Sequence, residues 1–350
     1  MQDGGGALMS LPISWQKEPG WRVAGTRDLD RWKVQAPCIM RSGDGRWRLF
    51  YTGVGPGKPF ADCQGYVLSA VSDDGLHFVP EPGIRVAPQP DLPQMALRVL
   101  APSIAARPQG GWRMYFEARG SADVPTAICS AVSDDQINWT VEQGARLTAP
   151  GGMSGPRFVP LADAAGRLYC VQSHYDARGP GHGPRIRQTL VSALTEDGLT
   201  FVMEPGVLLP ATDSALENAG ITAAVVVAGA PWRMVYSAWQ DVPPGTQVPL
   251  HPSADPTAQT GGGSANFAAA SIAADMAGYR SRILLARSDD GLMWDREGVI
   301  IEGDGYGGRD IDAVHAEDMS LIPLGDGRWR MYYAACDAQG VWRVASAIGA

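Results

Sequence analysis

A short aromatic segment recurs along the chain about every 60 residues. Each copy is rich in aromatic and apolar residues and is bounded by Gly, Asp or Pro, which is typical of a β-strand. The copies occupy residues 46–51, 111–116, 167–171, 231–236 and 328–333. A repeat of this length predicts a fold built from similar modules, and it constrains the architecture more than any other feature of the sequence.

Two further motifs keep a fixed order around this strand. A Ser-Asp-Asp-Gly-Leu-like motif follows it at residues 72–78, 133–139, 195–201 and 288–294. Asp-Gly between two apolar runs predicts a hairpin turn, because Gly accepts a positive φ and Asp bonds its own backbone. We interpret these aspartates as structural, since each turn requires one. The other motif precedes the aromatic strand at residues 36–40, 101–105, 155–159, 219–223 and 317–321.

Together these motifs predict four antiparallel strands per repeat, which is a propeller blade. The last repeat ends before its fourth strand, whereas residues 15–20 match the fourth strands at 78–83 and 201–206. We therefore predict an all-β, five-bladed β-propeller that forms one domain over residues 1–350. Its last blade would be closed by the N-terminal strand, which removes an exposed sheet edge. Two stacked β-sandwiches, the alternative, predict no such exchange between the termini.

Composition narrows the functional classes. The chain is 45% hydrophobic and 19% charged, as expected of a globular protein. Its net charge is −8, and the sequence contains no run of basic residues. These features argue against a nucleic acid or an anionic membrane as partner. The first ten residues lack the basic and apolar regions of a signal peptide, so we expect a cytoplasmic protein. The five cysteines have no metal-type spacing and are expected to be reduced.

The repeats also indicate where a site would lie. In a blade the innermost strand lines the central channel, so an axis-facing polar residue found in one repeat alone needs a reason other than blade structure. Glu117 is such a residue, because the other repeats have Thr52, Ser173, Ser237 and Ala334 at the position assigned to it. The predicted catalytic residues are Glu117, Glu217, Glu317 and Asp318, and the predicted ligand contacts are Arg98, His174, Asp176, Trp239, Arg309 and His315. Carboxylates with His, Arg and Trp suit a polyhydroxylated ligand and proton transfer on it.

Each of these features also has a structural interpretation. Glu317, Asp318 and Arg309 would then form an ion-pair cluster that plugs the channel, and Glu117 would be structural too. The loop histidines His182 and His251 are also interpreted as structural. Residues 240–280 in the fourth repeat, rich in Gly, Ser, Pro and Ala, predict either a lid over the channel or a disordered insert. No cofactor is required, although Glu317, Asp318 and His315 would suit a channel-bound cation such as calcium.

The three motifs together resemble those of the five-bladed propeller glycosidases. The resemblance rests on Ala-Pro-Ser-Ile at 101–104, Gly-Gly-Trp-Arg-Met-Tyr-Phe at 110–116 and Ser-Asp-Asp-Gly-Leu-x-Trp at 288–294. It points to the arabinanase, xylosidase and invertase clans (families 43, 32 and relatives), covers nearly the whole chain, and is more specific for architecture than for activity. It implies three catalytic acids, but the matching positions are Ala36, Ser103 and Ser154. Either the acids have moved, to Glu117, Glu217, Glu317 and Asp318, or the fold now serves a different function.

Three functions are consistent with this pattern. The first is a glycosidase-like enzyme that acts on a sugar or sugar-like molecule in the channel with relocated carboxylates. Retaining chemistry would need these carboxylates about 5 Å apart and inverting chemistry about 6.5–9.5 Å. The second is a repurposed propeller that performs a non-hydrolytic step on a small metabolite, as a cyclase, lyase or isomerase. The third is a carbohydrate-binding propeller without chemistry. The sequence predicts neither the substrate nor the oligomeric state.

Overall fold

The structure is a computed structural model that describes residues 11–55, 64–120, 124–161, 166–176, 185–210, 212, 214, 216–218, 220–240 and 280–350. The predicted lid, His182 and His251 lie outside these residues, except for the two ends of the lid at Gln240 and Arg280. The described part is all-β apart from one short 3-10 helix, η2 (Pro93–Met95). It includes no helix long and apolar enough to cross a membrane.

The strands pair in antiparallel units that follow the sequence repeats. The first unit consists of β3 (Lys33–Arg41), β4 (Trp47–Val54), β5 (Gly65–Ser72) and β6 (Val79–Pro80). The second unit consists of β7 (Arg98–Ala106), β8 (Trp112–Arg119), β9 (Ala127–Ser133) and β10 (Thr140–Val141). The third unit consists of β11 (Met153–Val159), β12 (Gly166–Asp176), β13 (Arg185–Thr195) and β14 (Val202–Met203). The fourth unit consists of β15 (Gly220–Val227), β16 (Trp232–Gln240), β17 (Arg280–Ser288) and β18 (Asp295–Ile301). The last is β19 (His315–Pro323), β20 (Trp329–Cys336) and β21 (Trp342–Gly349).

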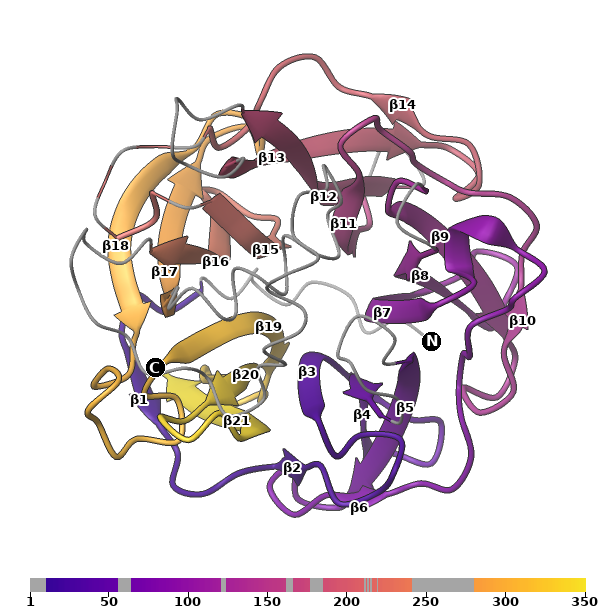
Figure 1. The fold of residues 1–350 in the computed structure, drawn as a ribbon. Coiled ribbons are helices and arrows are strands. Elements are labelled where there is room, and N and C mark those ends of the chain that lie inside the picture. The colour runs from indigo at the N-terminus through magenta and orange to yellow at the C-terminus, as the bar shows by residue number, and fades with distance from the viewer. Residues whose placement is uncertain are drawn as a thin grey trace.

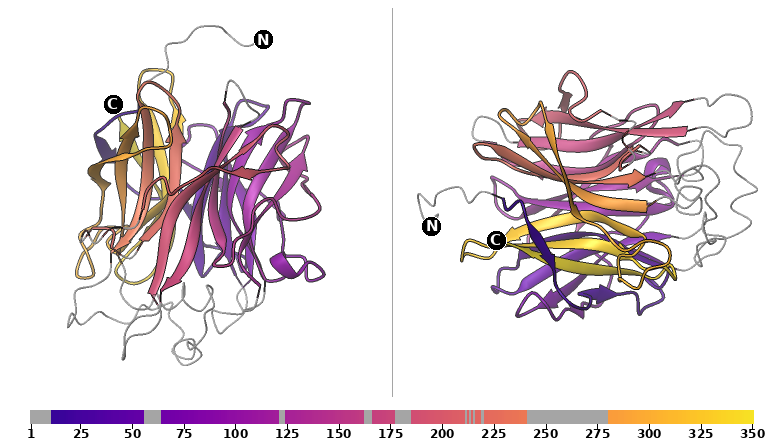
Figure 2. Two further views of the ribbon diagram at one scale, coloured as in Figure 1. Left: turned by 90° about the horizontal axis from the view of Figure 1, so that it is seen from above. Right: turned by 90° about the vertical axis from the view of Figure 1, so that its left-hand side faces the viewer.

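The units follow one another around a common centre. Figure 1 shows β3, β7, β11, β15 and β19 as the innermost strands. Figure 2 shows from the side that the strands of the different units lie roughly along one common axis. Single parallel pairs, Gly65 with Arg98 and Ser281 with His315, join neighbouring units. They produce a nine-stranded and an eight-stranded sheet beside a four-stranded one.

Both ends of the chain contribute to the last unit. Strand β1 (Trp15–Lys17) pairs antiparallel with β21, with Trp15 opposite Gly349, and β2 (Val23–Ala24) pairs with β21 as well. Figure 1 shows β1 on the outer side of this unit. The exchange predicted from residues 15–20 is therefore present, and it is not a feature of two stacked sandwiches.

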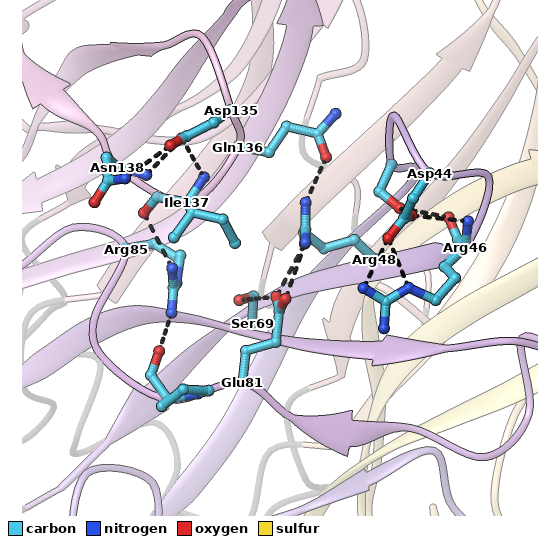
Figure 3. A network of polar contacts seen from close by, with 12 residues as sticks. Asp44, Arg46, Arg48, Ser69, Glu81, Arg85, Asp135, Gln136, Ile137 and Asn138 are labelled. Atoms are coloured by element: carbon cyan, nitrogen blue, oxygen red, sulfur yellow. Dashed lines mark hydrogen bonds and ion pairs between the residues drawn. The ribbon is translucent and has the colours of Figure 1, made fainter.

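An arginine–glutamate clamp braces the units between the second and fourth strands. In the first unit Arg48 donates through Nε and Nη2 to Glu81, both at 2.9 Å, and the Ser69 hydroxyl donates to the same carboxylate at 2.6 Å (Figure 3). The same pair recurs as Arg113–Glu142, Arg167–Glu204, Arg233–Glu297 and Arg330–Glu18. The arginine of the repeated aromatic motif is thus structural.

The Asp-Gly motif forms the predicted turn and also connects neighbouring units. Asp74 Oδ1 accepts the backbone N–H groups of Leu76 and His77 at 2.8 and 2.9 Å, which supports the structural interpretation of these aspartates. Backbone carbonyl groups of these turns also accept hydrogen bonds from tyrosine hydroxyls of the preceding unit. Tyr115 donates to Gly198, Tyr169 to Gly291 and Tyr332 to Gly75. In the second unit Gln136 replaces Gly, and Arg48 donates to its side chain at 2.9 Å (Figure 3).

Candidate functional site

Near the centre, each innermost strand breaks its pairing with the second strand at a β-bulge. Four bulges contain a residue with a positive φ: Ala36 at 49°, Ala101 at 50°, Gly155 at 55° and Asp318 at 51°. Such a conformation costs a residue with a side chain about 1 kcal/mol or more. Of these four residues, Asp318 alone carries a polar side chain, so the strained position in the last unit presents a carboxyl group.

The strand register corrects three alignments made from the sequence. Asp318 alone, not the Glu317-Asp318 pair, is the structural counterpart of Ala36, the position at which the resemblance implies the first catalytic acid. In the third unit the residue opposite Ser154 is Val171, so Val171 and not Ser173 corresponds to Glu117. In the fourth unit the bulge lies at Thr222 and not at residues 219–220. The sequence motif misled there because the unit has no Pro to mark the bulge.

The ends of the innermost and second strands surround a central cavity of about 80 Å³. Five of the predicted site residues line it, and they come from four different strands: Arg98, Glu117, Trp239, Glu317 and Asp318. Lys33, Arg119, Ser154, Gln188 and Thr222 are among the other lining residues. The structure therefore brings Glu117 and Glu317 to one cavity, although they are 200 positions apart in the sequence.

A set of aromatic and polar contacts fixes Glu317. Trp239 Nε1 donates to Glu317 Oε2 at 2.9 Å, and His315 Nδ1 lies 4.0 Å from the same oxygen. His315 stacks on the ring of Trp342 with centroids 5.1 Å apart, and its Nδ1 lies 3.1 Å from Ser281 Oγ. His315 is thus buried beside Glu317 and does not line the cavity.

The carboxyl group of Asp318 is set apart by its surroundings. Burial raises the pKa of Asp318, and the adjacent negative charge of Glu317 raises it further, against the opposing influence of Arg157 and Lys33. The net direction is upward from the ordinary value of 3.8. A carboxyl group that keeps its proton closer to neutral pH is suited to act as a general acid.

Glu117 is held by two structural contacts. Its Oε1 receives Arg119 Nε at 2.5 Å, and its Oε2 receives the backbone N–H of Gly155, the positive-φ residue of the next unit, at 3.3 Å. Thr52 and Ser237 make the corresponding contact, to the N–H groups of Ala101 at 2.8 Å and Asp318 at 3.3 Å. The structural interpretation of Glu117 therefore has direct support, although Glu117 also lines the cavity.

Other predicted site residues lie elsewhere. Glu217 is buried outside the cavity lining, where its Oε1 receives Arg296 Nε at 2.7 Å. Arg309 is exposed in a loop, and its backbone N–H donates to Asp304 at 2.7 Å, so it forms no channel plug with Glu317 and Asp318. His174 and Asp176 belong to β12 by their backbone, and their side chains lie outside the described part of the structure.

Sequence reasoning missed three buried or half-buried cations. Lys33 stands three residues before Ala36, as Arg98 stands three residues before Ala101, so the same comparison of repeats could have found it. Arg119 is the last residue of β8 and lies two positions after Glu117 on the same strand. Arg157 is buried, donates through Nη1 to the carbonyl of Pro156 at 2.8 Å, and occupies the position of Cys38 and Ser103.

The predicted channel cation gains no ligand set here. Among the residues that the structure describes, no group of three or more His, Cys, Asp or Glu side chains is placed to hold a metal ion. His315 faces Ser281 and Trp342, while Asp318 lines the cavity. A cation held by Glu317, Asp318 and His315 therefore stays a prediction.

Comparison with known proteins gives a fold and no closer relationship. No protein-family model matches the chain, and no curated protein matches it. A solved structure titled "Glycoside hydrolase" matches with a TM-score of 0.67 and 15% identity, over 96% of this chain and 92% of that one. A thermostable family-43 glycoside hydrolase matches with a TM-score of 0.61 and 11% identity, over 95% and 90%.

A third solved structure, β-1,2-mannobiose phosphorylase from Listeria innocua in complex with β-1,2-mannobiose, matches with a TM-score of 0.61 and 13% identity, over 93% and 94% of the two chains. At these identities the likeness shows the fold alone. The chain therefore has the all-β, propeller-like fold of these two glycoside hydrolases and this phosphorylase.

Proposed function

We propose that the chain is a five-bladed β-propeller enzyme that acts on a sugar or sugar-like molecule in its central cavity. The propeller interpretation is supported by the four-stranded units, by β1 in the last unit, and by Tyr332, which reaches from the last unit to the turn of the first. We further propose that residues 1–350 form one domain and that the protein is cytoplasmic. The fold that it shares with glycoside hydrolases supports a sugar as ligand.

One observation carries the proposal. Glu317 and Asp318, acids that the other units lack at these positions, line one central cavity at a strained bulge. Asp318 protonates the glycosidic oxygen, so the C–O bond breaks and the leaving alcohol departs with that proton. Water then forms the new bond to the anomeric carbon. Glu317, oriented by Trp239, stabilises the positive charge developing on the sugar and receives the proton of that water.

A second candidate function is a non-hydrolytic proton transfer, such as an isomerisation or an elimination. Glu317 and Asp318 belong to one strand, β19, and the acid from another wall, Glu117, is already bound to Arg119 and Gly155. Hydrolysis uses two carboxyl groups on either side of the scissile bond. Two acids from one wall suit the removal and return of protons on one face of a substrate.

Two substitutions test the proposal. Asp318→Asn and Glu317→Gln should each lower kcat/KM about hundredfold or more, because each removes a group that transfers or stabilises charge in the transition state. Substrate would be found by screening aryl glycosides for hydrolysis, and free sugars in D₂O for proton exchange by NMR. Asp295→Asn, at an exposed acid on the outer strand β18, is the matched control.

The outcomes separate the candidates. Release of sugar from glycosides supports hydrolysis, and deuterium exchange without bond cleavage supports the second function. Full activity in both variants would contradict both candidate enzyme functions. Ligand binding that survives both substitutions, with no turnover in any assay, would indicate a carbohydrate-binding propeller.

A further inference from the structure

Charge is unevenly distributed around the central cavity. The first and second units contribute the cations Lys33, Arg98 and Arg119, and the last unit contributes the acids Glu317 and Asp318. The third and fourth units contribute neutral side chains, among them Ser154, Gln188, Thr222 and Trp239. The acid on the cationic side, Glu117, is bound to Arg119 at 2.5 Å. The cavity therefore has a basic wall formed by Lys33 and Arg98, and an acidic wall formed by Glu317 and Asp318.

The basic wall is buried, and its cations are held in place. Arg98 is 4% exposed and Lys33 is 8% exposed. Lys33 Nζ lies 3.9 Å from the centroid of the Trp342 ring, which fixes its direction. A Cβ on Gly65, the parallel partner of Arg98, would lie 2.8 Å from Leu100 Cδ2 and 3.3 Å from Arg98 Cβ, so a side chain there would displace the Leu100 methyl group and crowd Arg98.

The basic wall does not follow from the bulk charge, since the chain as a whole carries −8. It also lies at equivalent positions of two neighbouring units, because Lys33 and Arg98 both precede the positive-φ residue by three. A guanidinium presents two parallel N–H donors that match a carboxylate or a phosphate, and an ammonium adds a compact charge. This combination recognises an anion better than a neutral hydroxyl group.

We infer that the sugar bound in the central cavity carries an anionic group, a carboxylate or a phosphate, that Arg98 and Lys33 receive. The inference rests on the proposed function, because it adds a charge requirement to the same site. The anionic group would lie beside Arg98 and the ammonium group of Lys33, which stands over Trp342 of the last unit. The reacting carbon would then face Glu317 and Asp318 of the last unit, so the anion orients the sugar for proton transfer.

Calorimetric titration with matched sugars tests this inference. The pairs are glucuronate with glucose, galacturonate with galactose, and the 6-phosphates of glucose and mannose with their parent sugars. In at least one pair the anionic member should bind about tenfold tighter or more, and its affinity should fall as salt rises. A preference for uronates identifies a carboxylate, and a preference for the 6-phosphates identifies a phosphate.

Variants locate the effect. Arg98→Gln should abolish the preference for the anionic sugar, Arg98→Lys should restore part of it, and Arg287→Gln, at an exposed arginine of β17, should leave it unchanged. If Arg98→Gln does not fold, Lys33→Gln should lower the same preference. Unchanged preference in folded Arg98→Gln and Lys33→Gln would overturn the inference.

The proposed function can survive this failure. If neutral sugars bind as tightly as their anionic partners in every pair, the charge requirement is wrong and a sugar site remains. If no sugar of either kind binds, the proposed function fails and the inference fails with it. If inorganic phosphate or acetate alone binds as tightly as any sugar and depends on Arg98, an anion site remains and the sugar proposal fails.

Discussion

Asp318 combines several unfavourable features in one residue. It has a φ of 51°, its carboxyl group is half-buried, and it follows another acid, Glu317. The corresponding residues Ala36 and Ala101 share the positive φ but carry no charge, and Gly155 avoids the backbone cost as well. Strained backbone and an unfavourable charge persist where the surrounding structure maintains them, and such positions cluster at functional sites.

The raised pKa of Asp318 predicts how the free energy of unfolding changes with pH. The folded state resists ionisation of this carboxyl, so the wild-type protein loses stability as pH rises above about 4 towards the raised pKa. Asp318→Asn removes that loss without changing the shape of the side chain. The variant should therefore be more stable than the wild type at pH 8, by about 1 kcal/mol or more, and this difference should shrink towards pH 4. Urea unfolding at several pH values measures it.

The turn acid Asp74 provides a control of opposite sign. Hydrogen bonds from the His77 side chain and from the backbone hold the pKa of Asp74 below its ordinary value. Its ionised form therefore stabilises the fold above the ordinary pKa, and this contribution disappears in acid. Asp74→Asn should be less stable than the wild type at pH 8. An Asp318→Asn variant that is destabilised in the same pH-dependent way would contradict our assignment of its environment.

At the scale of the element, the Arg–Glu clamp explains why very short fourth strands stay attached. Strand β6 has two residues, yet Glu81 beside it binds Arg48 through both oxygens and also receives Ser69 (Figure 3). Two backbone pairs alone would fix such a strand poorly. The charge-assisted hydrogen bonds anchor it to the second strand of its own unit.

The clamps should differ in strength. Glu81→Gln should destabilise the protein by about 2 kcal/mol, because it leaves the buried Arg48 without its counter-charge. Glu297→Gln should cost less, since Glu297 is 27% exposed and Leu285 stands where the other units have serine. Urea unfolding of both variants measures the difference, and equal losses would show that burial and the serine contact do not set the strength of the clamp.

At the scale of the molecule, the two chain ends stabilise one unit. Strand β1 covers the edge of β21, and Glu18 supplies the clamp carboxylate for Arg330, at 2.9 Å to both Nε and Nη2. Tyr332 in turn donates to Gly75 at 2.7 Å and connects the last unit to the first. The N-terminal segment therefore completes a unit that begins almost 300 residues later.

Deletion of residues 1–20 should lower the melting temperature by several degrees or more and promote association. It removes β1 and Glu18 together and leaves the edge of β21 open. Thermal unfolding and light scattering measure both effects, and deletion of residues 1–10 alone, which retains β1, is the matched control. A melting temperature unchanged by the longer deletion would show that the contribution of β1 is dispensable.

The sequence by itself determined the repeating unit. The aromatic strand, the Asp-Gly turn and the motif before the strand depend on backbone preferences and near neighbours, so their spacing predicted the strands, the turns and the pairing of the N-terminal strand with the last unit. The repeats also predicted Arg98, Glu117, Trp239, Glu317 and Asp318, which meet at the central cavity.

Only the tertiary structure decided which buried charges belong to the cavity. Glu117 and Glu217 looked alike in the sequence, but one lines the cavity while the other lies outside it and pairs with Arg296 of the outer strand β18. Lys33 is assigned to the site because it packs against Trp342 of another unit and lines a cavity that several units form. The repeat can place Lys33 at the position equivalent to Arg98, but the direction of both side chains is set by neighbours remote in the chain.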